Sequence, residues 1–315
     1  MPTVSIGLPV RNGLPFVRTA LDSLLAQTYA DFELIISDNA SDDGTADVCA
    51  EYASRDSRIR LIRNEQNIGG AANFNRAFQE SRGRYFKWAA ADDVCLPTFL
   101  ERCVDVVNDS PRVVLCYPKT QLIDAQGRRI EECQDNMHID NASAMWRFRY
   151  VLRNYIWANP IFGLLRADVV RKTQLHGAYP GSDSVLAAEI ALQGQFHELP
   201  DLLFLRRVHD DQSMKAYKTM RERASWFHPN RAGGRVFPGW RLVGEHIRAV
   251  RRAPLSSLNR CGCQLQIPFL VLRGRERLWD EVLYGCSLLP GLLKPLGSRD
   301  AEGTVFTNTA AAKRR

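Results

Sequence analysis

The sequence predicts an α/β fold, in which a mixed, mostly parallel sheet is flanked by helices and followed by a C-terminal helical extension. Three observations favour this fold. Short apolar runs alternate with segments whose apolar residues recur every three or four positions, polar clusters follow the apolar runs, and basic residues gather late in the chain. The 315 residues, 45% of them hydrophobic, suffice for one large domain and an appended region.

The first strand, helix and strand lie between residues 4 and 45. Val4–Val10 is an apolar run that ends at the turn signature Arg11-Asn12-Gly13. Residues 16–25 place their apolar side chains on one helical face, and a second apolar run, Phe32–Ser37, ends in a polar cluster that begins at Asp38. Such a unit has parallel strands and a right-handed crossover in nearly all proteins.

The next two strands bring further polar groups to the same edge. Ile59–Ile62 leads into a small-residue turn, Asn64–Asn73, which opens another helix. Arg84–Ala90 is a strand that delivers Asp92 and Asp93 to its carboxyl end, where open α/β sheets bind ligands.

Two adjacent carboxylates suit a hard divalent cation. Mg²⁺ and Mn²⁺ prefer carboxylate oxygens and commonly bridge one or two of them to substrate phosphates. The Asp92-Asp93 pair therefore predicts half of a metal-diphosphate site. The alternative is that Asp93 belongs to the start of a helix expected near Leu96-Pro97.

Together these segments resemble the nucleotide-binding half of glycosyltransferase family 2. The motifs that carry the resemblance are VSIGLPVRNG (4–13), SLLAQTYADFELIISDNASDDGT (23–45), NIGGAANFNRAF (67–78), RGRYFKWAAADD (82–93) and the Pro97 that follows. Each is weak alone, but their order and spacing are specific over about the first 120 residues. The resemblance implies a GT-A type, Rossmann-like sheet.

The resemblance also implies a donor site. Asp38 would accept hydrogen bonds from the base or ribose, Asp92 would contact the ribose, and Asp93 would hold Mn²⁺ or Mg²⁺. The family's acidic motif lacks its first acidic position here, because the chain reads Ala90-Ala91-Asp92-Asp93. The expected nucleotide-sugar-binding residues are Pro9, Val10, Arg11, Asp38, Asn67, Asp92, Arg207 and His209. Arg76 is a further cation near this site, or a solvated helix charge.

Residues beyond 113 indicate an acceptor half. We expect strands at 113–117, 122–124 and 126–130, a helix at 145–156, and a strand at 159–166 that leads into a helix. By resemblance, Asp183 ahead of the apolar helix 185–192 is the general base, since an acceptor hydroxyl must lose its proton as it attacks. The alternative is that Asp183 or Ser182 caps the helix, and Glu189 is the second candidate base.

The segment Arg206–Ser213 follows the next predicted strand, 202–205. It resembles the family pattern R-x-H-x-x-x-S, in which Arg207 and His209 would reach the diphosphate and His209 could also ligate the metal. The alternative for His209 is an ordinary surface histidine.

Charge separates the C-terminal region from the rest. Residues 231–299 hold 12 basic and 4 acidic side chains, whereas residues 1–230 hold 27 and 29. The amphipathic helix Trp240–Arg252 therefore either lies on an anionic membrane surface or packs against the catalytic domain. We expect a nucleotide-sugar-binding half (1–120), an acceptor-binding half (121–230), a basic helical extension (231–299) and a disordered tail (300–315).

The chain shows neither an 18-residue apolar run nor a signal-peptide pattern, and its eight cysteines lack paired metal-ligand spacing. We therefore expect a reduced cytoplasmic protein, with peripheral contact at the inner face of the plasma membrane as an option. No groove-reading motif indicates nucleic-acid binding.

The sequence thus predicts a metal-dependent inverting glycosyltransferase that uses a nucleotide-diphosphate sugar and a carbohydrate or lipid-linked acceptor, in cell-surface glycan or glycolipid synthesis. The alternatives are a weak or inactive sugar-binding or membrane-surface relative, and a nucleotidyltransferase. The latter should carry a Gly-rich first loop, which Leu8–Asn12 does not provide.

Overall fold

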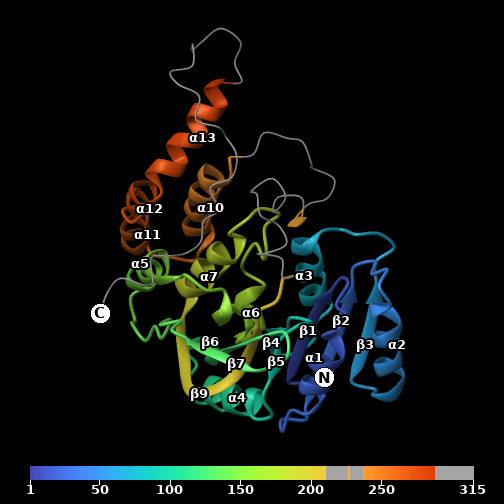
Figure 1. Cartoon of the computed structure of the whole chain (residues 1–315). Coiled ribbons are helices and arrows are strands. Elements are labelled where there is room, and N and C mark those ends of the chain that lie inside the picture. Colours follow the sequence, from blue (N-terminus) through green and yellow to red (C-terminus); the bar gives the residue numbers. More distant parts are fainter. Residues whose placement is uncertain (211–225, 228–236, 288–315) are drawn as a thin grey trace.

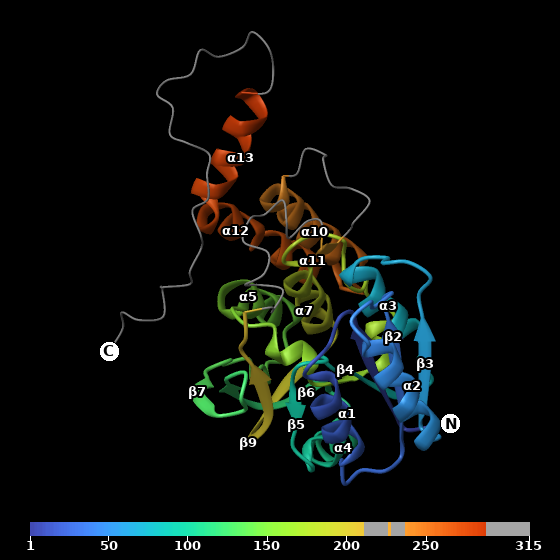
Figure 2. The same ribbon diagram turned by 45° about the vertical axis from the view of Figure 1, so that its right-hand side comes forward.

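A computed structural model describes residues 1–210, 226–227 and 237–287, and confirms the predicted α/β fold. A curled sheet of nine strands runs through the molecule, with helices on both of its faces, and the last four described helices stack beyond α5 and α7 (Figure 1, Figure 2). The predicted tail, 300–315, lies outside the described residues.

The sheet has the order β3-β2-β1-β4-β8-β6-β9-β5, and β7 pairs with β6. Strands β1–β4, β6 and β9 run in one direction, while β5, β7 and β8 run against them. The strands are β1 (Val4–Val10), β2 (Phe32–Asp38), β3 (Ile59–Arg63), β4 (Tyr85–Trp88), β5 (Val94–Cys95), β6 (Val113–Ile123), β7 (Arg129–Cys133), β8 (Leu164–Arg166) and β9 (Gln195–Arg207).

Helices cover the two faces of the sheet and bury two apolar clusters. One cluster lies beneath α1, α2 and α4, and the other lies beneath α3, α5, α6 and α7. The helices are α1 (Val17–Leu25), α2 (Thr45–Arg55), α3 (Gly70–Gln79), α4 (Phe99–Asp109), α5 (Ala144–Asn154), α6 (Ala167–Val170), α7 (Ser182–Gln193), α10 (Pro238–Arg252), α11 (Ser257–Gln264), α12 (Ile267–Arg273) and α13 (Arg275–Ser287).

Two local predictions were wrong. The expected strands at 113–117 and 122–124 are one strand, β6, whose pairing with β9 shifts register around Pro118 and Lys119. Residues 159–162 form a 3₁₀ turn rather than a strand, and only 164–166 pair in the sheet. The alternative that placed Asp93 at the start of a helix does not match the structure, because Asp93 precedes the short strand β5 and the next helix begins at Phe99. The two predicted halves of one domain, 1–120 and 121–230, share one sheet, and β6 spans the boundary between them.

The predicted basic helix exists as α10 and packs on α7. Ala249 and Val250 are buried, and the Arg252 guanidinium donates to Glu189 Oε1 at 2.7 Å from across the interface. Of the two alternatives for this helix, the contacts match the one in which it covers the catalytic domain. No helix among the described residues is both long and apolar enough to cross a membrane.

Candidate functional site

Polar side chains from four strand ends meet at one edge of the sheet. Because β1, β2, β4 and β9 run in the same direction, their carboxyl ends lie together and carry Arg11, Asp38, the Asp92-Asp93 pair and Arg207. β1 lies between β2 and β4, so the segment after Val10 separates Asp38 from the acidic pair. The structure thus places the residues predicted for the donor site along one continuous edge.

Asp38 supplies a buried carboxylate at the end of β2. Its side chain is fully buried, its Oδ2 accepts from the Ser41 backbone N–H at 3.4 Å, and the Arg63 Nε lies 3.7 Å away. Its Oδ1 has no hydrogen-bond partner among the described residues. A buried acceptor without a donor is costly unless a ligand satisfies it.

A network of asparagine amides lies beside Asp38. Asn67 Oδ1 accepts from the Asn39 Nδ2 at 2.8 Å and from the Gly69 N–H at 2.9 Å, and Asn64 Nδ2 donates to Asn39 Oδ1 at 3.0 Å. Arg76 donates to Asn64, so this cation belongs to the network. The sequence analysis missed Asn39, although its place directly after β2 was a signal.

The first-loop residues differ in exposure. Pro9 and Val10 are buried in β1, and the Val10 carbonyl accepts from the Asn39 N–H at 2.8 Å. Arg11 is exposed at the edge. The Trp226 ring lies against Gly70 at the start of α3, where even a Cβ atom would approach it to 2.6 Å. Trp226 therefore adds an aromatic wall near the asparagine network that the sequence analysis did not identify.

The two acidic side chains have different surroundings. Asp93 is buried and its Oδ1 accepts from the Arg207 N–H at 2.8 Å. Burial, reinforced by the Asp92 charge, raises the pKa of Asp93 to about 8. Asp92 is partly exposed, and its Oδ2 lies 3.1 Å from His209 Nε2.

These carboxylates suit a divalent cation whose remaining ligands are oxygen atoms of the substrate. Burial and the neighbouring Asp92 charge both raise the pKa of Asp93, so a nearby positive charge would be favourable there. Among the described residues no group of three or more His, Cys, Asp or Glu side chains could hold a metal ion. One or two carboxylates with phosphate oxygens is nevertheless a usual Mg²⁺ arrangement.

Arg206 and Arg207 point to opposite sides of β9, as successive strand residues do. Arg207 is buried, donates to the backbone carbonyls of Asp92, Asp124 and Ala125 at 2.9–3.2 Å, and stacks on Phe16 at 4.7 Å. Its guanidinium thus holds three neighbouring chain segments together, and contact with a diphosphate stays a prediction.

Arg206 is a cation whose charge acts on three acidic groups. Its Nη1 donates to Asn159 Oδ1 at 2.8 Å, and Asn159 Nδ2 donates to the buried Asp135 at 2.9 Å. Burial raises the pKa of Asp93, Asp135 and Asp183, and the Arg206 charge opposes each of these shifts. Arg206 was not among the predicted site residues, since the family pattern pointed to its neighbour.

Asp183 lies in the first turn of α7. The residue that caps the helix is Gly181, with φ +82°, so neither Ser182 nor Asp183 occupies the cap position. The Tyr155 hydroxyl donates to Asp183 Oδ2 at 3.3 Å. Burial raises the pKa of Asp183, which increases its basicity while hydrogen bonds and Arg206 limit the effect.

The second candidate base, Glu189, is engaged in contacts that hold α7 against its neighbours. It is buried, accepts the Gln174 N–H at 3.0 Å, and pairs with Arg252 of α10. Its acceptor positions are therefore occupied by the packing of α7 on its neighbours.

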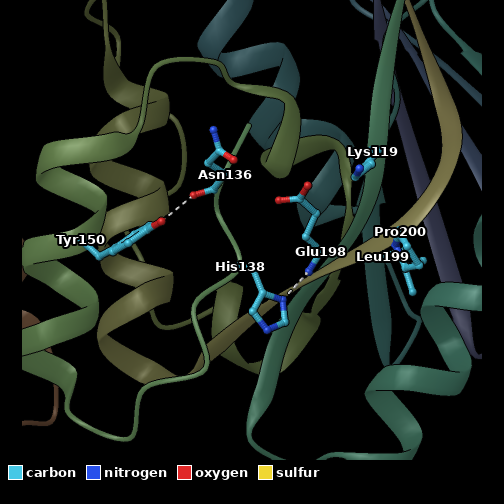
Figure 3. Close-up of a pocket in the computed structure, with 7 residues that line it drawn as sticks. All are labelled: Lys119, Asn136, His138, Tyr150, Glu198, Leu199 and Pro200. Carbon is cyan, nitrogen blue, oxygen red and sulfur yellow. Dashed lines mark hydrogen bonds between the residues drawn. The ribbon is translucent and has the colours of Figure 1, made fainter. Parts of the chain in front are cut away.

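A separate pocket of about 390 Å³ lies between α5 and strands β6 and β9 (Figure 3). Tyr150 Oη donates to the Asn136 carbonyl at 2.9 Å, and the Glu198 N–H donates to His138 Nδ1 at 3.3 Å. The other lining residues are Lys119, Leu199 and Pro200. Neither the acidic pair nor Asp183 lines this pocket, so it is distinct from the sheet edge.

Comparisons with known proteins agree with this architecture. A family model described as glycosyl transferase family 2 matches residues 5–162. An uncharacterized glycosyltransferase of Rickettsia prowazekii (strain Madrid E) is 32% identical over 130 residues, which cover 41% of this chain and 40% of that protein. The chain thus matches about two-fifths of that relative's length. An uncharacterized Haemophilus influenzae glycosyltransferase is 24% identical over 228 residues, covering 69% of this chain and 68% of its own.

Two solved structures share the fold at low sequence identity. S. aureus TarS 1-349 in complex with UDP has a TM-score of 0.54 at 13% identity, covering 97% of this chain and 99% of its own. The mannosyltransferase PcManGT from Pyrobaculum calidifontis, in complex with GDP-Man and Mn²⁺, has a TM-score of 0.51 at 16% identity, covering 89% and 88%.

Proposed function

The chain belongs to glycosyltransferase family 2, and from that premise we propose that it transfers a sugar from a nucleotide-diphosphate sugar to an acceptor hydroxyl with inversion. The observation that carries the proposal is the arrangement at the sheet edge. The unsatisfied Asp38 oxygen, the Asp92-Asp93 pair, Arg206 and Asp183 combine a nucleotide acceptor, a cation site, a positive charge and a base.

Each group has a task in a single displacement. Asp183 accepts the proton of the acceptor hydroxyl as that oxygen attacks the anomeric carbon, and Tyr155 orients the carboxylate. Arg206 stabilises negative charge that develops on the departing diphosphate. Asp38 accepts a hydrogen bond from the base or ribose, with Asn67 and Arg11 beside it.

The proposed cofactor is Mn²⁺ or Mg²⁺. Asp93 would hold it with Asp92, and when bound the ion would neutralise the diphosphate. His209 contacts Asp92 and fixes the position of that carboxylate, while the Arg207 backbone N–H fixes Asp93. Any contact of His209 or the Arg207 guanidinium with the diphosphate is part of the proposal.

The neighbours' ligands support a uridine or guanosine donor. TarS structures contain UDP and UDP-GlcNAc, and PcManGT contains GDP-Man with Mn²⁺. We propose a carbohydrate or lipid-linked acceptor in cell-surface glycan or glycolipid synthesis, at the cytoplasmic side of the membrane. A nucleotidyltransferase is disfavoured by the first loop, where the exposed Arg11 follows two buried residues and no Gly-rich phosphate loop is present.

Donor binding tests the proposal. We expect calorimetry to detect UDP or GDP binding that strengthens with Mn²⁺, and to detect no comparable binding of the corresponding nucleoside triphosphates. The matching nucleotide sugar should be slowly hydrolysed in the presence of metal. Binding without any turnover would support the inactive relative, and the absence of nucleotide binding would contradict the proposed donor.

A further inference from the structure

An exposed apolar stripe runs along α11 and α12. Leu258, Leu265 and Leu272 are 85%, 71% and 64% exposed, and they recur every seven positions. Gly262 and Phe269 lie between them at spacings of three and four, which places the five residues on one side of the helical run. Cys263 and Ile267 lie on the other side and are buried. The leucines are therefore an outward face, not an incomplete core.

Helix α5 lies directly beside this stripe. The Arg153 guanidinium covers the Phe269 ring at 4.4 Å, and Arg273 donates to the Leu152 and Arg153 carbonyls at 3.2 and 3.0 Å. The Met145 side chain contacts Gly262. Both ribbon views place α11 against α5 (Figure 1, Figure 2). The exposed face of α5 and the leucine stripe thus form one surface.

The α5 part of this surface is aromatic and basic. Trp146 and Tyr150 stack with ring centroids 5.0 Å apart, and together with Arg149, Arg153 and Asn154 they line a pocket of about 370 Å³. Beyond the helix, Ile156 and Trp157 are 55% and 38% exposed. Trp, Tyr and Arg beside exposed leucines are typical of segments that lie in a membrane interface.

Acidic residues are missing from both segments that build the surface. Residues 141–167 and 257–275 contain no Asp or Glu, although the whole chain contains 35. They contain Arg149 and Arg153 on α5, and Arg260 and Arg273 on α11 and α12. The charged side chains that these two segments contribute beside the apolar stripe are therefore all basic.

We propose that this surface, formed by residues 145–157 of α5 and its following turn and residues 258–273 of α11 and α12, binds an anionic lipid bilayer. The leucines and Trp146 would enter the interface while the arginines contact lipid phosphates. A second copy of the chain fits less well. A two-fold interface would place the same arginine-rich segments against themselves, and neither segment contributes an acid to compensate.

The surface leads to the catalytic edge. Arg206 lies over the Trp157 ring at 5.4 Å and donates to Asn159, which in turn donates to the buried Asp135. The Tyr155 hydroxyl, two residues before Trp157, donates to Asp183. A lipid-linked acceptor whose carrier remains in the bilayer would therefore approach these groups past Trp157. This last step rests on the proposed sugar transfer, whereas membrane binding itself does not.

Vesicle co-sedimentation of the full chain tests the proposal. We expect the protein to pellet with phosphatidylcholine vesicles that contain phosphatidylglycerol, to remain in solution with phosphatidylcholine alone, and to be released as NaCl rises. Arg149→Gln with Arg153→Gln should weaken binding roughly fivefold for each charge removed. The control pair Arg55→Gln and Arg82→Gln removes the same charge from exposed sites in the donor half and should change little.

A second comparison tests the apolar part. Leu265→Gln should weaken vesicle binding, whereas Ile130→Gln, at a residue 55% exposed on β7, should not. Equal effects of surface and control variants, equal pelleting with neutral vesicles, or no pelleting would overturn the assignment. So would a dimer in light scattering that Leu265→Gln dissociates, which would make the stripe an interface between copies. Nucleotide calorimetry on the same variants tests donor binding independently. It therefore distinguishes a failure of membrane binding from a failure of the proposed sugar transfer.

Discussion

Adjacent arginines at the end of β9 have different surroundings because strand geometry turns them to opposite sides. Arg207 is buried against backbone carbonyls, and the charge of Arg206 acts on Asp93, Asp135 and Asp183. A sequence pattern cannot distinguish two consecutive arginines by charge. Their roles follow from the partners that lie on each side of β9.

We expect Arg206→Gln to lower turnover by about 10²-fold with little change in thermal stability, since a positioned charge stabilises the leaving group. Arg207→Gln should lower the melting temperature, because buried carbonyls lose their donors. Steady-state kinetics and thermal unfolding of both variants check the contrast. The opposite pattern, with Arg207→Gln stable but inactive, would assign the leaving-group role to Arg207.

Asp93→Asn should abolish transfer while the fold remains intact. The substitution removes one charge from the predicted cation site but keeps an oxygen that can accept the Arg207 N–H. Manganese titration monitored by calorimetry with UDP or GDP, and circular dichroism as the folding control, provide the measurement. Turnover near that of the wild type at low manganese would show that Asp93 is not the metal ligand.

Asp183→Asn should lower turnover by roughly 10²–10⁴-fold with little change in donor affinity, because a base acts on the transition state. Glu189→Gln provides a matched comparison on the same helix and should largely retain turnover. Transfer kinetics with donor titration give both parameters. A variant with unchanged turnover and reduced stability would reveal a purely structural role for Asp183.

At the scale of elements, α10 and α7 are connected by an ion pair in which the acidic partner is buried. Glu189 has a 4% exposed side chain, and Arg252 is its cationic partner from 63 residues along the chain. Arg248 pairs instead with Glu245 within α10. Arg252 is therefore the arginine of α10 that pairs with the buried acid of α7.

Arg252→Ala should lower the unfolding free energy by about 2–4 kcal/mol, since it leaves a buried carboxylate without its cation. Arg251→Ala removes the same charge from an exposed neighbour and should be close to neutral. Chemical denaturation of the two variants measures the difference. Equal stabilities would mean that Glu189 is adequately solvated or satisfied by Gln174 alone.

At the scale of the whole molecule, the buried Asp135 connects strand β6 to Arg206 of β9 through Asn159. Asp135 accepts hydrogen bonds from Thr120 of β6 at 3.1 Å and from Asn159 at 2.9 Å, and Asn159 accepts from Arg206. Burial raises the pKa of Asp135 to about 6 from an ordinary value of 3.8, even though these donors oppose the shift.

This shift predicts the direction of a pH effect on stability. Because the folded pKa is raised, the protonated form is favoured in the fold, and stability is lost as pH rises from about 4 to about 6. Asp135→Asn should remove about 3 kcal/mol of that loss. Denaturation of both proteins from pH 4 to pH 7 gives the difference. A wild-type protein that gains stability relative to the variant over this range would contradict the raised pKa.

The sequence by itself determined the parts that local chemistry controls. Apolar periodicity was enough to predict β1, α1, β2 and α5, and the order of strand ends was enough to place Asp38 and the Asp92-Asp93 pair on one edge. These features depend on side chains a few residues apart. The same local reasoning left two alternatives for helix 240–252 and for Asp183, because capping, catalysis and packing use the same residue types.

Only the tertiary structure decided features that depend on distant partners. The pairing of β9 with β6 and β5 turned Arg206 toward the acids, and the approach of Asn159 and Asp135 gave that arginine its neighbours. Contact between α7 and α10 covered the basic helix, and contact between α5 and α12 created the exposed leucine surface. The physical reason is that burial, which sets the cost of a charge and the exposure of a leucine, is a property of the packed chain and not of any single segment.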